Sequence, residues 1–121
     1  MDQPFSDTDA TVPTNIVVAR KERQVRPRHL DQIDGEGAPR TFKLVQDELI
    51  IGRADDATIR MPSARLSRHH ARLKRRGEEY SIRDDESRNG IFLNGVKVHS
   101  AVLRDGDIIQ VADCVFAYRE S

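Results

Sequence analysis

The chain has 121 residues, of which 20 are basic and 20 are acidic, so its formal net charge is zero. This length suits one domain with a terminal segment, and the balanced charge gives no overall field that would favour nucleic acid or a membrane surface. There is no apolar run of the ~18 residues that a membrane helix needs, no signal-peptide pattern at the start, and a single cysteine, Cys114, which excludes a disulfide framework. We therefore expect a soluble, cytoplasmic protein.

The beginning of the chain differs in composition from the rest. An acidic, hydroxyl-rich stretch at residues 1–15 is followed by the apolar run Ile16–Ala19 and then by a basic run at residues 20–28. Clustered charge with little apolar content is typical of segments that do not fold alone. We predict a flexible, mainly disordered tail over residues 1–27, in which Ile16–Ala19 pairs at most transiently, and one folded domain over residues 28–121.

From residue 28 onward, short apolar runs alternate with turn residues. The runs predicted as strands are His29–Ile33, Thr41–Val45, Leu49–Ile51, Arg68–Lys74, Glu79–Arg83, Ile91–Leu93, Val96–Val98, Asp107–Val111 and Cys114–Tyr118. Arg75-Arg76-Gly77 is predicted as a turn, and Asn94-Gly95 is the pair most typical of a two-residue hairpin. No window shows a capped helical period. The pattern predicts an all-β fold, a two-sheet antiparallel β-sandwich.

Two predicted loops, Gly52–Leu66 and Asp84–Gly90, are too long and too polar for tight hairpins. Three clusters at strand ends hold guanidinium, hydroxyl and amide groups: Gly52-Arg53, Ser67–Ala71 and Ser87–Gly90. A phosphorylated side chain carries about −1.5 to −2 charge and three strong acceptor oxygens. A guanidinium fork, a hydroxyl donor and backbone N–H groups are the partners it requires. We expect the clusters to converge at one end of the sandwich.

Six segments occur in a fixed order and spacing: Leu49–Arg53, Thr58–Pro62, Leu66–Ala71, Tyr80–Asp84, Ser87–Gly95 and Leu103–Ile109. Together they resemble the forkhead-associated (FHA) domain, across roughly residues 28–121. The resemblance implies a sandwich of about eleven short strands. It also implies that loops at one end bind phosphothreonine-containing peptides, with no cofactor, no metal and no catalysis.

The resemblance assigns a role to each matching residue. It implies that the Arg53 guanidinium contacts the phosphate and that the Ser67 hydroxyl donates to a phosphate oxygen. Arg68 matches a neighbouring position whose side chain or backbone contacts the phosphothreonine. Asn89 matches the asparagine that hydrogen-bonds the peptide backbone beside the phosphorylated residue.

Four further positions complete the implied site. His70 matches a buried histidine that holds the binding loop, and Gly52 and Gly90 match glycines in tight backbone. Arg88 lies where many family members carry threonine. An arginine there adds charge to the site or turns into solvent, which leaves the discrimination between phosphothreonine and phosphoserine open.

Three other interpretations of the polar residues, as a catalytic pair, a metal site or a nucleic-acid site, are less well supported by the sequence. Ser67 and His70 suggest a nucleophile and its base, but residues three apart in a strand face opposite sides, and no acidic residue is placed to orient the histidine. Asp55-Asp56 and Asp84-Asp85 lack further ligands at metal-site spacing, so we predict solvated turns. Lys74-Arg75-Arg76 is predicted as a hairpin tip, and no aromatic residues interleave with its charges as nucleic-acid binding would favour.

The acidic stretch contains three threonines, Thr8, Thr11 and Thr14. We hypothesise that a Ser/Thr protein kinase phosphorylates one of them, Thr11 first, and that the domain captures it in the same chain or in a second copy. The expected partners are therefore phosphothreonine-containing proteins, a Ser/Thr kinase or its substrates, and the tail itself. Two alternatives remain open: a phosphorylation-independent interaction module, and a nucleic-acid-associated protein that uses the basic linker at residues 20–28.

Overall fold

The computed structural model describes residues 27–120, which form eleven strands and no helix. In chain order the strands are β2 (Arg28–Asp34), β3 (Arg40–Leu44), β4 (Glu48–Gly52), β5 (Ile59–Arg60), β6 (Ala71–Arg76), β7 (Glu79–Asp84), β8 (Ile91–Leu93), β9 (Val96–Val98), β10 (Ser100–Val102), β11 (Ile108–Val111) and β12 (Cys114–Arg119).

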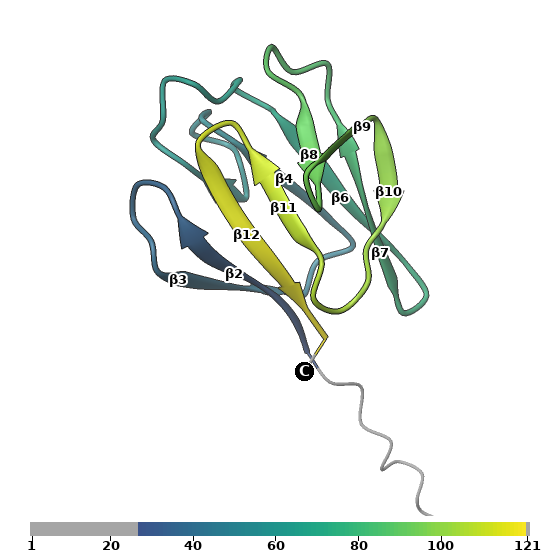
Figure 1. The fold of residues 1–121 in the computed structure, drawn as a ribbon. Coiled ribbons are helices and arrows are strands. Elements are labelled where there is room, and N and C mark those ends of the chain that lie inside the picture. The colour runs from purple at the N-terminus through teal and green to yellow at the C-terminus, as the bar shows by residue number, and fades with distance from the viewer. Residues whose placement is uncertain (1–26, 121) are drawn as a thin grey trace, which may run out of the picture.

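The strands form two sheets that pack face to face (Figure 1). One sheet has five strands in the order β10-β7-β6-β4-β5, and the other has six in the order β3-β2-β12-β11-β8-β9. Neighbouring strands are antiparallel except β4 and β5, which are parallel. The predicted all-β sandwich is confirmed, with one parallel pair at the edge of the five-stranded sheet.

The alternation of side chains along each strand decides which of them form the core. On β7, Tyr80 and Ile82 are buried between the sheets, whereas Ser81 and Arg83 lie on the outer face. Tyr80 meets Tyr118 of β12 edge to face, with ring centroids 6.5 Å apart, so this aromatic pair joins the two sheets. Each large apolar side chain buried in this way stabilises the fold by about 1.5–3 kcal/mol.

The hairpin between β6 and β7 differs from its prediction. A strand at Arg68–Lys74 and a turn at Arg75–Gly77 were expected, but β6 spans Ala71–Arg76 and the turn lies at Gly77-Glu78. Gly77 has a φ of +64°, a conformation that glycine adopts without a side-chain clash, so the chain reverses there. The prediction that residues 74–76 form the hairpin tip is wrong, because all three are paired strand residues.

Two strands were missed by the sequence analysis. β5 has only two residues and pairs in parallel with β4, a contact that no local pattern signals. β10 has the sequence Ser-Ala-Val, which is too short and polar to show an alternation, and it pairs antiparallel with β7. Both strands form because a neighbouring sheet edge offers backbone partners.

Several predictions concern residues outside the described range. These are the tail predicted over residues 1–27, of which only Pro27 is described, and the strand-like run Ile16–Ala19. The threonines Thr8, Thr11 and Thr14 and the basic residues before Pro27 also lie outside the described residues. Arg28, predicted as part of the basic linker, is instead the first residue of β2, and its guanidinium donates to the Glu78 carbonyl at 2.7 Å. Within residues 27–120 there is no helix of the length and hydrophobicity needed to cross a membrane.

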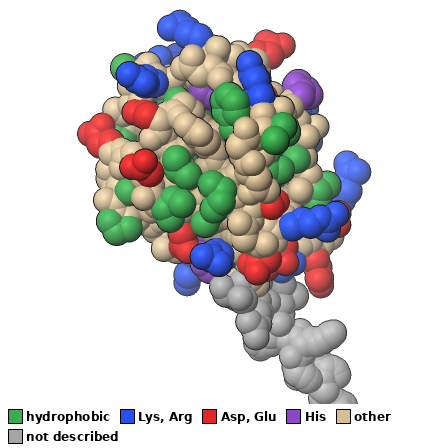
Figure 2. Space-filling view, viewed as in Figure 1, with side chains coloured by type: hydrophobic (Ala, Val, Ile, Leu, Met, Phe, Trp, Pro, Cys, Tyr) green, Lys and Arg blue, Asp and Glu red, His purple; other side chains and the backbone are tan. Residues whose placement is uncertain are grey.

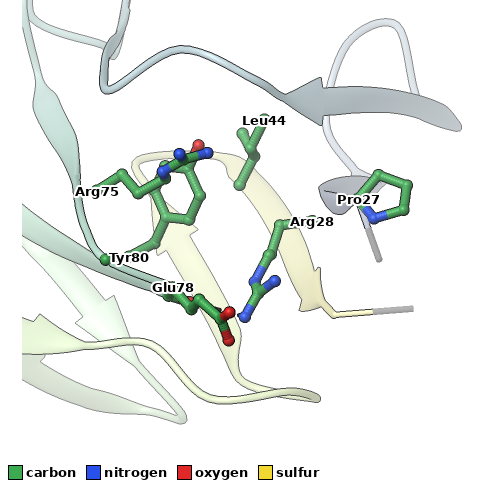
Figure 3. A pocket seen from close by; sticks show the side chains of 7 residues that line it. Pro27, Arg28, Leu44, Arg75, Glu78 and Tyr80 are labelled. Carbon is green, nitrogen blue, oxygen red and sulfur yellow. Dashed lines mark hydrogen bonds between the residues drawn. The ribbon is translucent and has the colours of Figure 1, made fainter. Parts of the chain in front are cut away.

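The described chain begins at the end of the sandwich that carries the β6–β7 turn. Figure 3 shows this end, where Pro27, Arg28, Leu44, Arg75 and Tyr80 line a hollow together with the turn residues. The face in view in Figure 2 is that of the six-stranded sheet, and it carries hydrophobic side chains among charged ones. The loops that follow β4 and β7 lie at the opposite end of the molecule (Figure 1).

The two tyrosines are the only ones in the chain and report on its core. Burial raises the pKa of Tyr118 to about 12 and raises the pKa of Tyr80 above its ordinary value. In the unfolded chain both ionise near pH ~10. The contribution of the two buried phenols to the free energy of unfolding is therefore fully present below pH ~10 and is lost as the pH rises towards 12, because the unfolded state releases these protons first.

This predicts the result of a titration followed by tyrosinate absorbance. The curve of the native protein should lie at higher pH than the curve measured in urea, and coincident curves would contradict the packing of the two tyrosines.

Candidate functional site

Two loops meet at one end of the sandwich. The first loop (residues 53–70) joins β4 to β6 and contains β5, and the second loop (residues 85–90) joins β7 to β8. A Cβ on Gly52 would overlap the carbonyl of Arg68, so only glycine lets the end of the first loop lie against β4. Backbone hydrogen bonds complete this contact, from the Arg53 N–H to the Ser67 carbonyl at 3.1 Å and from the Ala54 N–H to the Arg68 carbonyl at 3.0 Å.

A fully buried histidine connects the two loops. The Nδ1 of His70 accepts the Ser67 N–H at 3.1 Å, and its Nε2 lies 2.8 Å from the Gly90 carbonyl. Since a backbone N–H can only donate, Nδ1 is the acceptor and Nε2 carries the hydrogen. The His70 carbonyl also accepts the Asp85 N–H at 2.9 Å. One neutral imidazole therefore fixes the distance between the first and second loops.

The hydroxyl of Ser67 lies between the loops with its hydrogen available. Its Oγ accepts the Arg88 N–H at 3.0 Å. A serine hydroxyl has one donor hydrogen and two acceptor lone pairs, so a bond accepted from the backbone leaves the hydrogen to point elsewhere. Ser67 is half-buried. The second loop thus aims the Ser67 hydroxyl as a donor.

Internal hydrogen bonds hold the second loop in shape. The Ser87 hydroxyl donates to the Asp84 carboxylate and accepts the Gly90 N–H at 2.8 Å. Glu86 and Gly90 both have positive φ, at 55° and 79°, which turns the chain sharply in this short loop. Asp84 is therefore occupied within the loop, and Arg88 and Asn89 are presented at its tip.

Backbone carbonyls of the first loop orient two of the candidate side chains. The Nε of Arg53 donates to the Leu66 carbonyl at 3.1 Å, and the Asn89 amide donates to the Arg65 carbonyl at 2.8 Å. Among residues 27–120, no acceptor is present for the terminal nitrogens of Arg53. Both side chains are therefore fixed while part of their hydrogen-bonding capacity remains exposed.

These groups surround a hollow of about 240 Å³ at the tip of the sandwich. Its lining residues are Arg53, Ala64, Arg65, Leu66, Ser67, Arg88 and Asn89. Four of the five predicted binding residues line it, and the fifth, Arg68, does not: its side chain is exposed and its carbonyl holds Ala54. The three predicted supporting residues, Gly52, His70 and Gly90, are not among those that line it.

Arg65 lines the hollow but was not singled out from the sequence. Its N–H donates at 3.2 Å to the Ser63 hydroxyl, which in turn donates to Asp113 at 2.8 Å, so its backbone is anchored to the turn before β12. Arg65 could have been predicted, because it is a basic residue two positions before Ser67 in the sequence. It was overlooked because the whole segment Gly52–Leu66 was interpreted as one polar loop.

The charge around the hollow is uncompensated. Within residues 27–120, Arg53, Arg65 and Arg88 have no carboxylate partner. Three guanidinium groups that face one hollow repel one another unless an anion lies between them. The arrangement is therefore suited to a multiply charged anion.

Nearby acidic residues are engaged elsewhere. Asp55 pairs with Arg60 at 3.3 Å, and Asp56 pairs with His69 at 2.8 Å. The hydrogen bond from His69 holds the pKa of Asp56 below its ordinary value. No group of three metal-ligating side chains occurs in the described part of the chain.

Ser67 and His70 do not form a nucleophile–base pair. Both ring nitrogens of His70 are engaged by the backbone, and the Ser67 hydroxyl lies against the Arg88 N–H.

Replacing His70 by alanine should destabilise the fold by about 2–5 kcal/mol, because it leaves the Ser67 N–H and the Gly90 carbonyl without partners and opens a cavity. His69→Ala is the matched control. It removes only a surface pair with Asp56 and should change the free energy of unfolding far less than His70→Ala does. Urea denaturation of both variants measures the difference, and equal losses would show that His70 does not hold the loops.

Comparison with known proteins shows which sequences and structures this chain is similar to. A family model described as the FHA domain matches residues 49–112. The FHA domain-containing protein FhaB of Mycobacterium tuberculosis is 33% identical over 107 residues, which cover 78% of this chain and 69% of FhaB. An ABC transporter ATP-binding/permease protein of the same species is 46% identical over 79 residues, which cover 64% of this chain but only 9% of the transporter.

A solved structure gives the same result in three dimensions. It comes from a structural and functional analysis of phosphothreonine-dependent FHA domain interactions. It is 30% identical in sequence and superposes with a TM-score of 0.73, covering 78% of this chain and 97% of the other.

Proposed function

The chain belongs to the forkhead-associated (FHA) domain family, and we propose that it binds phosphothreonine-containing peptides in the hollow between its two loops. The observation that carries the proposal is the uncompensated charge of Arg53, Arg65 and Arg88 around the Ser67 hydroxyl. FHA domains are binding modules, so the role proposed is an adaptor in Ser/Thr kinase signalling. Any catalysis then belongs to the protein that it recruits.

The proposed contacts follow from the groups that remain available. The Arg53 guanidinium, held by the Leu66 carbonyl, offers its terminal N–H groups to two phosphate oxygens. The Ser67 hydroxyl donates to the phosphate, and Arg88 adds charge from the second loop. Asn89 is placed at the rim, where its amide can bond the peptide backbone beside the phosphothreonine. Arg68 lies outside the hollow and contributes from its edge.

The expected affinity is moderate. Hydrogen bonds to charged groups contribute about 1.5–3 kcal/mol each. Three or four of them, less the cost of ordering the peptide, correspond to a Kd in the micromolar range. Such binding is reversible on the timescale of kinase and phosphatase action, as recruitment by phosphorylation requires.

Replacing Arg53 by alanine should weaken phosphopeptide binding by about 10- to 150-fold, because it removes charge-assisted bonds of about 1.5–3 kcal/mol. Arg60→Ala is the matched control, since Arg60 is an exposed arginine on β5 that pairs with Asp55 and does not line the hollow. Isothermal titration with a phosphothreonine peptide and its unphosphorylated form measures the effect. Binding that survives Arg53→Ala would instead favour the phosphorylation-independent module.

We also propose that the tail can supply a ligand for the hollow. The described chain starts at Pro27, at the opposite end of the sandwich, roughly 20 Å from the hollow, which is the length of a six-residue strand such as β6. Sixteen residue steps separate Thr11 from Pro27 (27 minus 11). A chain of that length extends to at most about 55 Å, so phosphorylated Thr11 could reach the hollow of its own domain.

Phosphorylating Thr11 should lower the affinity for an external phosphopeptide, because a tethered ligand at roughly millimolar effective concentration competes with a micromolar one. Titration of the external peptide into the phosphorylated and unphosphorylated chains measures the change, and Thr11→Ala treated with the same kinase is the control. Thr8 and Thr14 are tested in the same way. An unchanged affinity would contradict capture of the tail.

A further inference from the structure

We propose that the outer face of the five-stranded sheet holds a second binding site, which takes an extended acidic segment of a partner protein. The site is a basic trough formed by Arg72, Lys74, Arg76, Ser81, Arg83 and Val102. It lies on a sheet face and shares no lining residue with the hollow between the loops. The inference therefore goes beyond phosphothreonine binding and does not depend on it.

The basic wall of the trough follows from the alternation along β6. Ala71 and Leu73 are fully buried in the core, so Arg72, Lys74 and Arg76 lie on the outer face of the sheet. Alternate residues of a strand are about 6.6 Å apart. β6 therefore presents three cations at regular spacing along one line.

A small side chain on the next strand forms the floor. β7 pairs with β6 so that Ser81 lies opposite Lys74, and β10 pairs with β7 so that Val102 lies opposite Ser81. The long side chains of β6 and the Val102 side chain thus rise on either side of Ser81. Two adjoining hollows of about 410 and 460 Å³ share Lys74, Arg76, Ser81 and Val102, so the depression is continuous along β7.

The trough has more positive charge than its surroundings neutralise. Arg72 is paired with Asp85 at 3.0 Å and with Glu48 at 3.2 Å. Lys74, Arg76 and Arg83 have no ion-pair partner among residues 27–120. This local excess stands out because the whole chain has a net charge of zero.

Two of the cations lie opposite each other. Arg72 of β6 and Arg83 of β7 are cross-strand partners. Because Asp85 and Glu48 already pair with Arg72, the positive charge left for a ligand at this pair is that of Arg83. Glu79, which also lines the depression near the β6–β7 turn, is the one acidic residue among those that line it.

The shape of the trough favours an extended peptide over a nucleic acid. Its length along β6 from Arg72 to Arg76 is about 13 Å, and alternate side chains of an extended peptide repeat with the same spacing as the three cations. Carboxylates at every second position would therefore face the cations in register. Binding of single-stranded nucleic acid relies on aromatic side chains that stack on bases, and no aromatic residue is among those that line the trough.

The trough and the phosphothreonine site should act independently. Between them lie the end of β7, where Asp84 is bonded to Ser87, and the first residue of the second loop, Asp85, which is bonded to Arg72. The Asp84 carboxylate has no cationic partner among residues 27–120 and would repel an acidic peptide that continued from the trough into the hollow. One partner could therefore occupy both sites only if a non-acidic spacer separated its acidic segment from its phosphothreonine. Otherwise two different partners would occupy them.

The probe for this site is an unphosphorylated peptide of alternating glutamate and serine, roughly eight residues long. The peptide is titrated into the full chain, and binding is followed by the amide chemical shifts of the protein. The resonances of β6, β7 and β10 should move, and those of both loops should stay in place.

Lys74→Glu should weaken the binding of this peptide by about tenfold or more, because it reverses a charge in the wall of the trough. Lys43→Glu is the matched control, since Lys43 is exposed on β3 of the other sheet.

Amide dispersion shows whether each variant is folded, and added salt should weaken the binding because these charges are exposed. The proposal is overturned if the shifts fall on the two loops, if Lys43→Glu weakens binding as much as Lys74→Glu, or if the folded chain gives no shifts. It is also overturned if a single-stranded oligonucleotide of equal charge binds more tightly to β6, β7 and β10 than the peptide does.

Discussion

The site depends on one buried side chain, the imidazole of His70. It accepts a hydrogen bond from the first loop and donates one to the second, so the separation of the loops is fixed by the width of one ring. Both ring nitrogens are engaged by neutral backbone groups, and the ring is fully buried, so the interaction is rigid and carries no charge.

The rest of the hollow follows from that spacing. With the loops held apart by His70, the Ser67 hydroxyl reaches the Arg88 N–H, and the Asn89 amide reaches the Arg65 carbonyl. Each contact joins one loop to the other and orients a side chain of the proposed site. Arg53 is held in the same way within the first loop. The ligand would therefore meet groups that are already ordered, which lowers the cost of binding.

The sequence predicted most closely those elements that depend on local chemistry. β8 and β9 have the expected bounds because Asn94 and Gly95 both adopt positive φ, as a tight two-residue hairpin requires. β5 and β10 escaped prediction because they exist only through pairing with distant strands.

The same division applies to the site. Four of the residues that line the hollow, Arg53, Ser67, Arg88 and Asn89, were predicted because a fixed motif contains them. Arg65 was missed, and the sequence did not show that Arg68 lies outside the hollow, since the path of the first loop determines which side chains face inward. The trough could not be predicted either, because Lys74 and Arg76 form one of its walls only when β7 and β10 lie beside β6 in the folded sheet.

The two proposed sites differ in how their positive charges are arranged. The loops gather guanidinium groups around a point, which suits a compact dianion, whereas the sheet spaces its cations along a line, which suits an extended acidic chain. The central claim concerns the first of these. A crystal structure of the chain with a phosphothreonine peptide tests it most directly: the phosphate should lie within hydrogen-bonding distance of the Arg53 guanidinium and the Ser67 hydroxyl. A phosphate bound anywhere else on the molecule would contradict the account.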